Sequence, residues 1–117
     1  KVLPNIQAVF AGDAIDDKMI GTIISIAMSS EPFTMDKPIL GFANSTGVSK
    51  ISGRGTPDLV RRGLNLGKIM KEAAEKHGGT GGGHDIAAGA QVPLGAEEAF
   101  LSSADELVKK TVTGVVL

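Results

Sequence analysis

The 117-residue sequence has no cysteine, no tryptophan and no tyrosine, and its only aromatic residues are four phenylalanines. Without cysteine the chain forms neither a disulfide framework nor a thiolate metal site, which suits a cytoplasmic protein. The scarcity of aromatic rings disfavours a free-standing platform for single-stranded nucleic acid, because such platforms stack bases on these rings. Any hydrophobic core must therefore be built from aliphatic and small side chains.

Long apolar runs are also missing. The longest, residues 19–28, is interrupted by Gly21, Thr22 and Ser25, so it is too short and too polar to span a bilayer. No signal peptide is visible. We therefore expect a cytoplasmic protein without a membrane partner, large enough for one domain with a modest core. Because the sequence begins with Lys1 rather than methionine, we expect it to be a fragment.

The net charge of −1 is unevenly distributed along the chain. Residues 50–76 carry seven basic and three acidic side chains, which gives this segment +4 and the remainder −5. A concentration of positive charge favours a phosphorylated partner. For the individual lysines, a solvated helix face is the better explanation.

Apolar periodicity and turn residues predict a chain in which strands and helices alternate. The predicted elements are strands at residues 6–10, 39–43, 48–53 and 89–92, helices at residues 16–29 and 96–109, and a helix over residues 56–77 that breaks near residues 63–65. The two middle strands form an antiparallel hairpin, residues 86–88 make a brief helical turn, and residues 111–117 are either a terminal strand or a frayed tail. This order predicts one α/β (α+β) domain over residues 1–117, with helices packed on a mixed β-sheet.

Capping residues mark the predicted helix starts. Thr56, followed by a proline, is a strong start, and Asn65 begins a second helix after the break. Asp16 is predicted as the N-cap of the first helix, with Asp17 in its first turn, where the helix dipole favours acidic groups. Together with Asp13 these carboxylates are alternatively a site for a hard cation, but capping explains them better.

The strongest functional signal is the segment GGTGGGHDIAAGA at residues 78–90, in which five of the first six residues are glycine. A glycine run costs conformational entropy, and one compensation is that bare backbone lets N–H groups converge on an anion such as phosphate. His84, directly after the run, adds a hydrogen-bond donor and, when protonated, a charge. The alternatives are a flexible linker or, for Gly78, a helix C-cap. His77, in the last turn of the preceding helix, is interpreted as structural.

A second candidate is Arg54, which lies between two glycines at the end of a predicted strand. Its guanidinium group can grip a phosphate through two hydrogen bonds, and the flanking glycines leave room for a ligand. The alternative is a surface arginine in a loop, which is where most arginines lie. We predict that Arg54 and His84 bind the same phosphate.

Four segments carry a family resemblance. The motif GGGHDIAAGA at residues 81–90 resembles the signature of the DHH-associated C-terminal domain, which accompanies the DHH phosphoesterases. The segments AGDAIDDKMIGTIISIA (11–27), VSKISGRGT (48–56) and RRGLNLG (61–67) are similar, in the same order, to the archaeal RecJ-like branch of that family. The resemblance thus covers most of the chain.

This resemblance implies a domain that holds the substrate phosphate, with contacts from Arg54, Gly81, Gly82, Gly83 and His84. The substrate would be single-stranded nucleic acid or a short oligonucleotide. Hydrolysis would belong to the protein's own N-terminal DHH domain, which binds two Mn²⁺ (or Mg²⁺) ions, and the parent would be a phosphodiesterase or exonuclease. This sequence has no D-H-H motif and no carboxylate–histidine cluster with metal-ligand spacing. We therefore expect no catalytic residue, no bound cofactor or metal, and no hydrolytic activity in the fragment.

Two other functions remain open. The same domain occurs in oligoribonucleases and cyclic-dinucleotide phosphodiesterases. A non-catalytic alternative is a nucleic-acid-binding module like the C-terminal domain of alanyl-tRNA synthetase. That domain generally lacks the motif GGGHDIAAGA, and the presence of this motif here favours the phosphoesterases.

Overall fold

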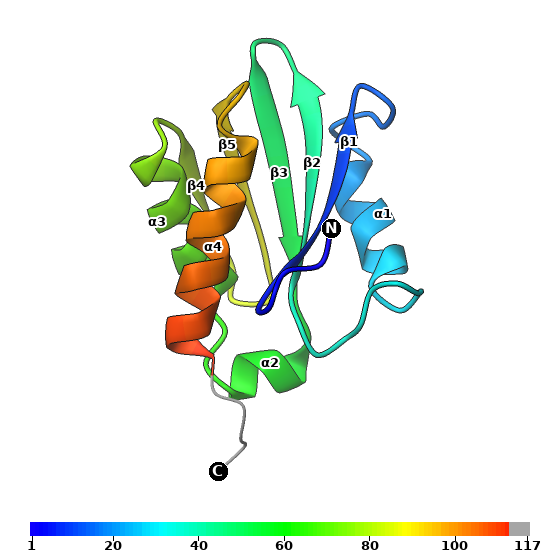
Figure 1. Ribbon diagram of the computed structural model, residues 1–117, viewed down its shortest axis with the longest axis vertical. Helices are drawn as coiled ribbons and strands as arrows, with labels where there is room; N and C mark the ends of the chain where they lie inside the picture. Colours follow the sequence, from blue (N-terminus) through cyan, green and yellow to red (C-terminus); the bar gives the residue numbers. More distant parts are fainter. Residues whose placement is uncertain (113–117) are drawn as a thin grey trace.

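Five strands form a mixed sheet in the order β1-β2-β3-β5-β4, with helices on both faces (Figure 1). The computed structural model describes residues 1–112, so the strand or tail predicted for residues 111–117 lies, from residue 113 onward, outside the described residues. The elements are β1 (Gln7–Gly12), α1 (Ile20–Ala27), β2 (Ile39–Ser45), β3 (Val48–Arg54), α2 (Pro57–Arg61), α3 (Leu66–Lys76), β4 (Thr80–Gly83), β5 (Ala87–Pro93) and α4 (Glu97–Thr111).

The sheet is mixed because β1 and β2 run parallel while the other three strand pairs are antiparallel. A parallel pair needs a long crossover, and here the crossover contains α1. The predicted β2–β3 hairpin is present, and its two-residue turn uses Gly47 at a φ of +73°. The predicted α/β class is confirmed, but the sheet contains one strand more than predicted because the glycine-rich segment forms β4.

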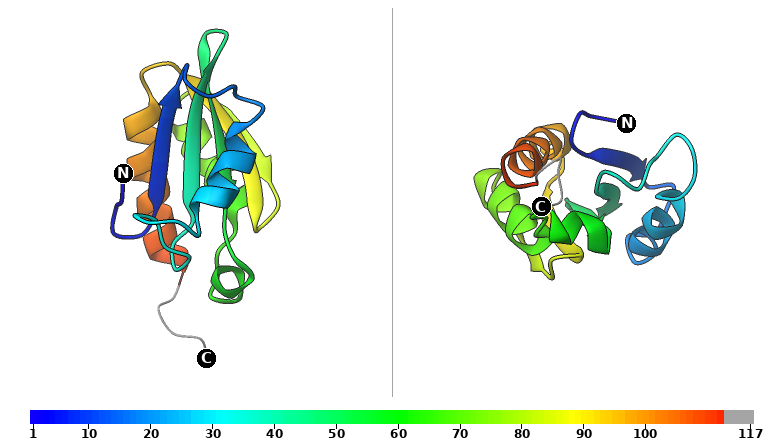
Figure 2. Two further views of the ribbon diagram at one scale, coloured as in Figure 1. Left: turned by 90° about the vertical axis from the view of Figure 1, so that its right-hand side faces the viewer. Right: turned by 90° about the horizontal axis from the view of Figure 1, so that it is seen from below.

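The helices are divided between the two faces of the sheet. Helix α1 packs on β2 and β3 on one face, while α3 and α4 pack together on the other, against β3, β4 and β5. Figure 2 shows this division from two sides: α1 crosses the region of β2, and the part of its face formed by β5 and β4 carries no helix. The uncovered area of the sheet is therefore on the same face as α1.

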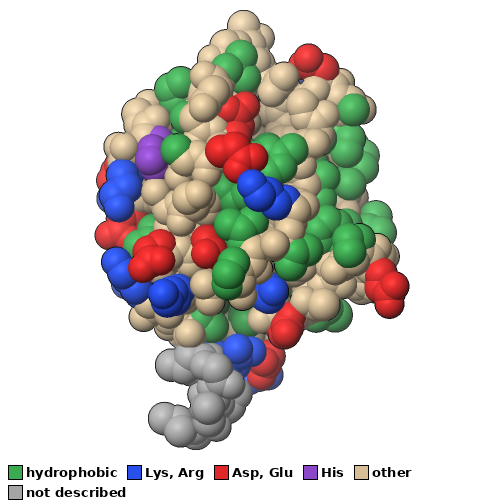
Figure 3. Space-filling model, viewed as in Figure 1, with side chains coloured by type: hydrophobic (Ala, Val, Ile, Leu, Met, Phe, Trp, Pro, Cys, Tyr) green, Lys and Arg blue, Asp and Glu red, His purple; other side chains and the backbone are tan. Residues whose placement is uncertain are grey.

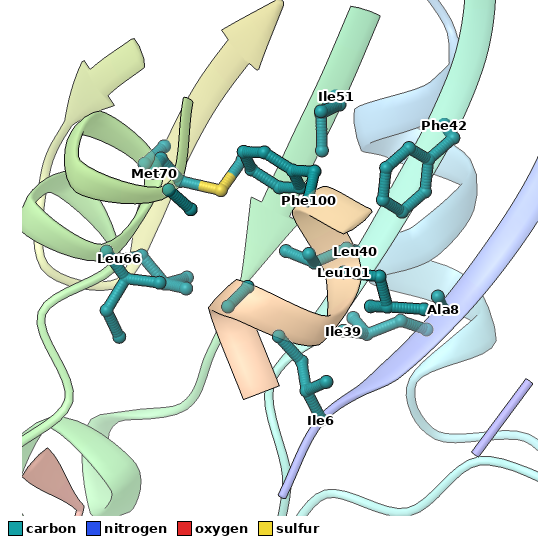
Figure 4. Packing of buried hydrophobic residues seen from close by; sticks show 14 of the residues in the cluster. Ile6, Ala8, Ile39, Leu40, Phe42, Ile51, Leu66, Met70, Phe100 and Leu101 are labelled. Carbon is teal, nitrogen blue, oxygen red and sulfur yellow. The ribbon is translucent and has the colours of Figure 1, made fainter. Parts of the chain in front are cut away.

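The core lies mainly between the sheet and the α3–α4 layer, with a smaller part between the sheet and α1, and it is mainly aliphatic, as the composition requires (Figure 4). Phe100 of α4 lies between Met70 of α3 and Phe42 of β2, and its ring meets that of Phe42 edge-on at a centroid distance of 6.0 Å. Such edge-to-face pairs add to the stabilisation from burial. On α4, Phe100, Leu101, Ala104 and Val108 are buried, while Leu107 is only partly buried.

The first helix is shorter than predicted, because α1 begins at Ile20 rather than at residue 16. Asp16 is not its N-cap, and no acidic residue lies in its first turn. Instead, the Asp16 carboxylate accepts a hydrogen bond from the backbone N–H of Lys18 at 2.8 Å and so forms a turn ahead of the helix. Aspartate competes with helix formation through such local bonds. At its other end, α1 stops at Ala27, two residues before the predicted end at residue 29.

The other predicted helix starts are confirmed. Thr56 accepts a hydrogen bond from the N–H of Leu59 at 3.2 Å and caps α2, and Asn65 accepts one from the N–H of Lys68 at 3.2 Å and caps α3. The break between these helices occurs at Gly63, where φ is +112° and only glycine is unstrained. These caps fix where β3 ends and where α3 begins, which are both parts of the candidate site.

Candidate functional site

The glycine-rich segment forms an edge strand, β4, which the sequence did not predict. Strand β4 pairs antiparallel with β5, with Gly82 opposite Gly89, and among residues 1–112 no strand flanks β4 on its outer side. The N–H groups of an extended strand point alternately to its two sides, so they do not converge on one anion. The brief helical turn predicted at residues 86–88 is also wrong, because β5 begins at Ala87. Contacts from individual glycines to a phosphate stay a prediction.

Close packing accounts for several of these glycines. A Cβ atom on Gly79 would lie 2.0 Å from the carbonyl oxygen of Gln91, and one on Gly81 would lie 2.6 Å from that of Met70 in α3. Likewise, a Cβ on Gly67 would lie 2.4 Å from the carbonyl oxygen of Gly83. Helix α3 therefore packs directly on the backbone of β4, where side chains would separate the two elements.

Gly82 is different, because a Cβ atom there would have no neighbour within 4 Å. It faces away from α3, onto the uncovered part of the sheet. Packing thus gives no reason for glycine at this position.

The start of the glycine run ends helix α3, as one of the two alternatives predicted. Gly78 has a φ of +79°, and the N–H groups of His77 and Gly79 both donate to the carbonyl of Ala74, at 3.0 and 2.8 Å. This is a glycine C-cap. His77 bonds Ser103 of α4 with 2.7 Å between its Nε2 and the Ser103 Oγ, consistent with a structural role.

The turn between β4 and β5 is held in place by backbone hydrogen bonds from two other segments. The carbonyl groups of His84 and Asp85 accept from the first two N–H groups of α3, each at 2.9 Å. The carbonyl of Ile86 accepts from the N–H of Gly55, also at 2.9 Å. The backbone of His84 is thereby fixed beside the end of β3, while its side chain is exposed.

The sheet register brings Arg54 and His84 into one row, meaning residues that lie side by side across the strands, with Ala87 between them. Arg54 lies opposite Ala87 on β5, and the carbonyl of Ala87 accepts a hydrogen bond from the N–H of His84 at 2.9 Å. Two such pairings across the sheet separate the Cα atoms of Arg54 and His84 by about 10 Å. An arginine and a histidine at this spacing are close enough to approach one phosphate from two sides.

Arg54 is partly buried and points its guanidinium group toward α1. A Cβ atom on Gly21 of α1 would lie 2.5 Å from Arg54 Nη2 and 3.4 Å from the Ser52 hydroxyl, so both groups lie beside that glycine. Arg54 Nη1 donates to the carbonyl of Gly53 at 2.8 Å. Among residues 1–112, no ion pair involves Arg54. A partly buried cation without a carboxylate partner is electrostatically suited to an anionic ligand.

Two pockets lie along the uncovered face. The first, here called the Arg54 pocket, has a volume of about 400 Å³ and includes Arg54, Ser25, Thr56, Ile86 and Ala87 in its walls. The second, here called the Lys50 pocket, has a volume of about 640 Å³, and its lining includes Lys18, Lys50, Ser52, Thr80, Gly89 and Gln91, with Asp17. The alternation of β3 explains the arrangement, because Lys50, Ser52 and Arg54 lie on one face while Ser49, Ile51 and Gly53 are buried on the other.

The opposite face is less suited to a polyanion. Acidic and basic side chains are mixed over the α3–α4 layer, and hydrophobic side chains gather toward β1 and α1 on the right of the view (Figure 3). A pocket of about 710 Å³ at this layer contains three carboxylates and two lysines: Glu72, Glu75, Asp85, Lys68 and Lys71. The basic segment 50–76 is thus divided, and only its first part lies on the uncovered face.

Lys50, Ser52 and Lys18 were not among the predicted site residues. The signal that identifies Lys50 and Ser52 is the two-residue period of β3, which places them on the same side as Arg54. Lys18 reaches this face through the turn before α1, which no local pattern predicts.

The described residues provide no obvious metal site. Within residues 1–112, no group of three or more His, Cys, Asp or Glu side chains is arranged to hold a metal ion. No helix in the same range is long and apolar enough to cross a membrane.

Comparison with known proteins gives one family and several relatives. Residues 5–110 match the DHHA1 domain family. The uncharacterized protein MJ0831 of Methanocaldococcus jannaschii is 44% identical over 90 residues, which are 77% of this chain and 19% of that protein. The alanine–tRNA ligase of Bacillus pumilus is 47% identical over 73 residues, which are 61% of this chain and 8% of the ligase. The chain therefore spans about a fifth or less of the curated relatives it matches.

Solved structures share the fold. The C-Ala domain of Aquifex aeolicus alanyl-tRNA synthetase has a TM-score of 0.67 at 11% identity, covering 93% of this chain and 91% of that domain. RecJ from Thermus thermophilus, solved in complex with Mn²⁺, has a TM-score of 0.65 at 18% identity, covering 96% of this chain and 15% of RecJ. At these identities the likeness establishes the fold alone.

Proposed function

The chain belongs to the DHHA1 domain family, and from this premise we propose that it holds the substrate phosphate in a RecJ-like, single-strand-specific exonuclease of the DHH phosphoesterases. The observation that carries the proposal is the position of Arg54. It is a partly buried cation with no ion pair among residues 1–112, it lines a pocket on the uncovered face, and it shares a row with His84.

The uncovered face with its two pockets is called the groove below, and each residue at its Arg54 end has a distinct role in the proposal. Arg54 supplies a planar fork of N–H donors that matches two phosphate oxygens. His84 donates from the other side of the row, and its protonated form adds a charge. Gly82, with no side chain and no neighbour at its Cβ position, lets the ligand approach the backbone closely.

Hydrolysis is assigned in this proposal to a separate N-terminal DHH domain of the parent protein, where Mn²⁺ or Mg²⁺ would be bound. The residues described here do not form a ligand set for these ions. The part played by this chain is therefore to bind and orient a single-stranded nucleic acid or a short oligonucleotide. Orientation matters because a misplaced phosphate loses the advantage of proximity to the reacting groups. An oligoribonuclease or a cyclic-dinucleotide phosphodiesterase would use the domain in the same way.

A second candidate is the nucleic-acid-binding module of an alanine–tRNA ligase. The identity of 47% over 73 residues with the Bacillus pumilus enzyme favours it. In this case the ligand would be a structured RNA and the parent protein a ligase.

The test measures binding of a short 5′-phosphorylated single strand by fluorescence anisotropy. Arg54→Ala is expected to weaken binding by about 10- to 100-fold, since a hydrogen bond to a charged group contributes about 1.5–3 kcal/mol. Arg61→Ala is the matched control, because this exposed arginine on α2 pairs with Asp58 at 3.6 Å, away from the groove. Equal losses in the two variants would mean that only overall charge matters, and no loss in either would refute the phosphate site. Tighter binding of folded tRNA than of any single strand would favour the ligase module.

A further inference from the structure

The uncovered face continues past Arg54 into the Lys50 pocket. Lys50, Ser52 and Arg54 follow one another on the same side of β3, and the register sets them opposite Gln91, Gly89 and Ala87 of β5. The Lys50 pocket therefore extends the line of the Arg54 pocket along the strand.

The Lys50 pocket has two cationic side chains and one carboxylate. Lys50 comes from the floor of the pocket, and Lys18 and Asp17 come from the turn ahead of α1. Among residues 1–112, neither lysine takes part in an ion pair. Both ammonium groups are thus available to an anion, in contrast to the α3–α4 pocket, where carboxylates outnumber lysines.

The spacing of the cations fits two anionic groups rather than one. The Arg54 guanidinium group lies beside Ser52, because both approach the same point at Gly21. Lys50 lies two positions before Ser52 on the strand, so their Cα atoms are about 7 Å apart. Because side chains stand roughly perpendicular to a sheet, the Lys50 ammonium group serves a different anionic group from the one at Arg54.

The floor between these positions carries no bulky side chain. A Cβ atom on Gly82 would have no neighbour within 4 Å, and one on Gly89 would meet only the carbonyl oxygen of Ile51, at 3.5 Å. An extended ligand can therefore lie flat on the backbones of β4 and β5 while its anionic groups follow β3.

We propose that the Lys50 pocket is a second phosphate subsite, with Lys50 and Lys18 binding the phosphate next to the one held by Arg54 on the same strand. The proposal rests on the function proposed above. It specifies the ligand as a linear strand with at least two consecutive phosphates, in preference to a mononucleotide or free phosphate.

The test compares a 5′-phosphorylated mononucleotide, dinucleotide and trinucleotide by isothermal titration. The full chain should gain about tenfold in affinity from the first ligand to the second. Lys50→Gln should abolish this gain and leave mononucleotide binding unchanged. Lys71→Gln, which removes a lysine from the α3–α4 pocket, is the matched control and should behave as the unmodified chain does.

Salt dependence provides a second readout. For the trinucleotide, the plot of the logarithm of the association constant against the logarithm of salt concentration has a negative slope. In Lys50→Gln this slope should be less steep by about 0.7, the value for one phosphate contact on a single strand. The slope in Lys71→Gln should be unchanged. Circular dichroism establishes that both variants are folded.

The outcomes separate this proposal from the one on which it rests. If Lys50→Gln weakens the mononucleotide and the dinucleotide equally, or weakens neither, the second subsite is refuted while the Arg54 site stands. If inorganic phosphate binds as tightly as the dinucleotide, a linear strand is not the ligand. If Arg54→Ala leaves mononucleotide binding intact, the proposed function itself fails.

Discussion

Gly81 and Gly82 are adjacent in β4, and replacing each with alanine should change stability in opposite directions. Their side-chain positions face opposite sides of the sheet. A Cβ atom on Gly81 would lie 2.6 Å from the carbonyl oxygen of Met70, whereas one on Gly82 would have no neighbour within 4 Å. Neither residue has a positive φ, so backbone strain does not distinguish them. The pair therefore isolates the effect of packing against α3.

The expected magnitudes follow from these distances. Gly81→Ala must push α3 away from β4, and overpacking of this kind costs about 1–3 kcal/mol of unfolding free energy. Gly82→Ala should stabilise the fold by about 0.4–1 kcal/mol, because it restricts the unfolded chain without meeting any atom in the folded one. In a domain of this size, 1 kcal/mol corresponds to a change in Tm of roughly 4 °C.

Thermal melts and urea denaturation of the two variants measure the difference. If Gly82→Ala is as destabilising as Gly81→Ala, or if Gly81→Ala is neutral, then close packing of α3 is not the reason for the glycines of β4. The variant Gly82→Val extends the test to function. It places a branched side chain on the floor of the groove and should lower oligonucleotide affinity at least tenfold, by an estimate from one lost charged contact, while the fold remains intact. Unchanged binding in Gly82→Val would show that the ligand does not lie on this floor.

Three further predictions concern other parts of the chain. The chain alone, incubated with Mn²⁺ and short oligonucleotides, should yield no cleavage product by gel analysis. If nuclease activity co-purifies with the chain, the assignment of hydrolysis to another domain is refuted. Gln7→Met should lower the unfolding free energy measured in urea by about 2–4 kcal/mol. The fully buried amide of Gln7 makes three hydrogen bonds with the backbone at Thr34 and Lys37, and each contributes about 1 kcal/mol. A loss under about 0.5 kcal/mol would contradict this. His77→Ala should lower Tm without changing oligonucleotide affinity, because the His77 side chain bonds Ser103 and so joins two helices. His84→Ala should instead lower oligonucleotide affinity without changing Tm. The reverse pattern in melts and titrations would exchange their assigned roles.

Much of the chain could be predicted from local sequence. Thr56 and Asn65 cap helices by accepting from N–H groups three residues ahead. Helix α3 ends where Gly78 takes a positive φ and the N–H groups on either side of it donate to the carbonyl of Ala74. The β2–β3 hairpin closes through a two-residue turn with glycine at a positive φ. These interactions join residues only a few positions apart in the sequence, so the local sequence pattern nearly determines their geometry.

Asp16 shows where a local pattern is ambiguous. An aspartate ahead of apolar residues at helical spacing is compatible both with a helix N-cap and with a separate turn. The structure contains the turn, and α1 starts four residues later than predicted. The apolar residues at helical spacing are divided: Ile20, Ile24 and Met28 are buried, whereas Met19 is half exposed.

The sequence by itself determined the candidate site residues: a glycine run, a histidine directly after it, and an arginine between glycines at the end of a strand. Only the tertiary structure decided their arrangement. The glycine run became β4 because β5 pairs with it on one side and α3 packs closely on its backbone. Both partners adjoin β4 in the sequence, but the pairing and the close approach are contacts between elements, which the local propensity of a glycine run does not specify. The register of β3 on β5 then set Arg54 in the row of His84, and the same register placed Lys50 two steps along the face. Strand pairing and close packing depend on the whole chain, which is why the sequence predicted the candidate residues but not the groove that they line.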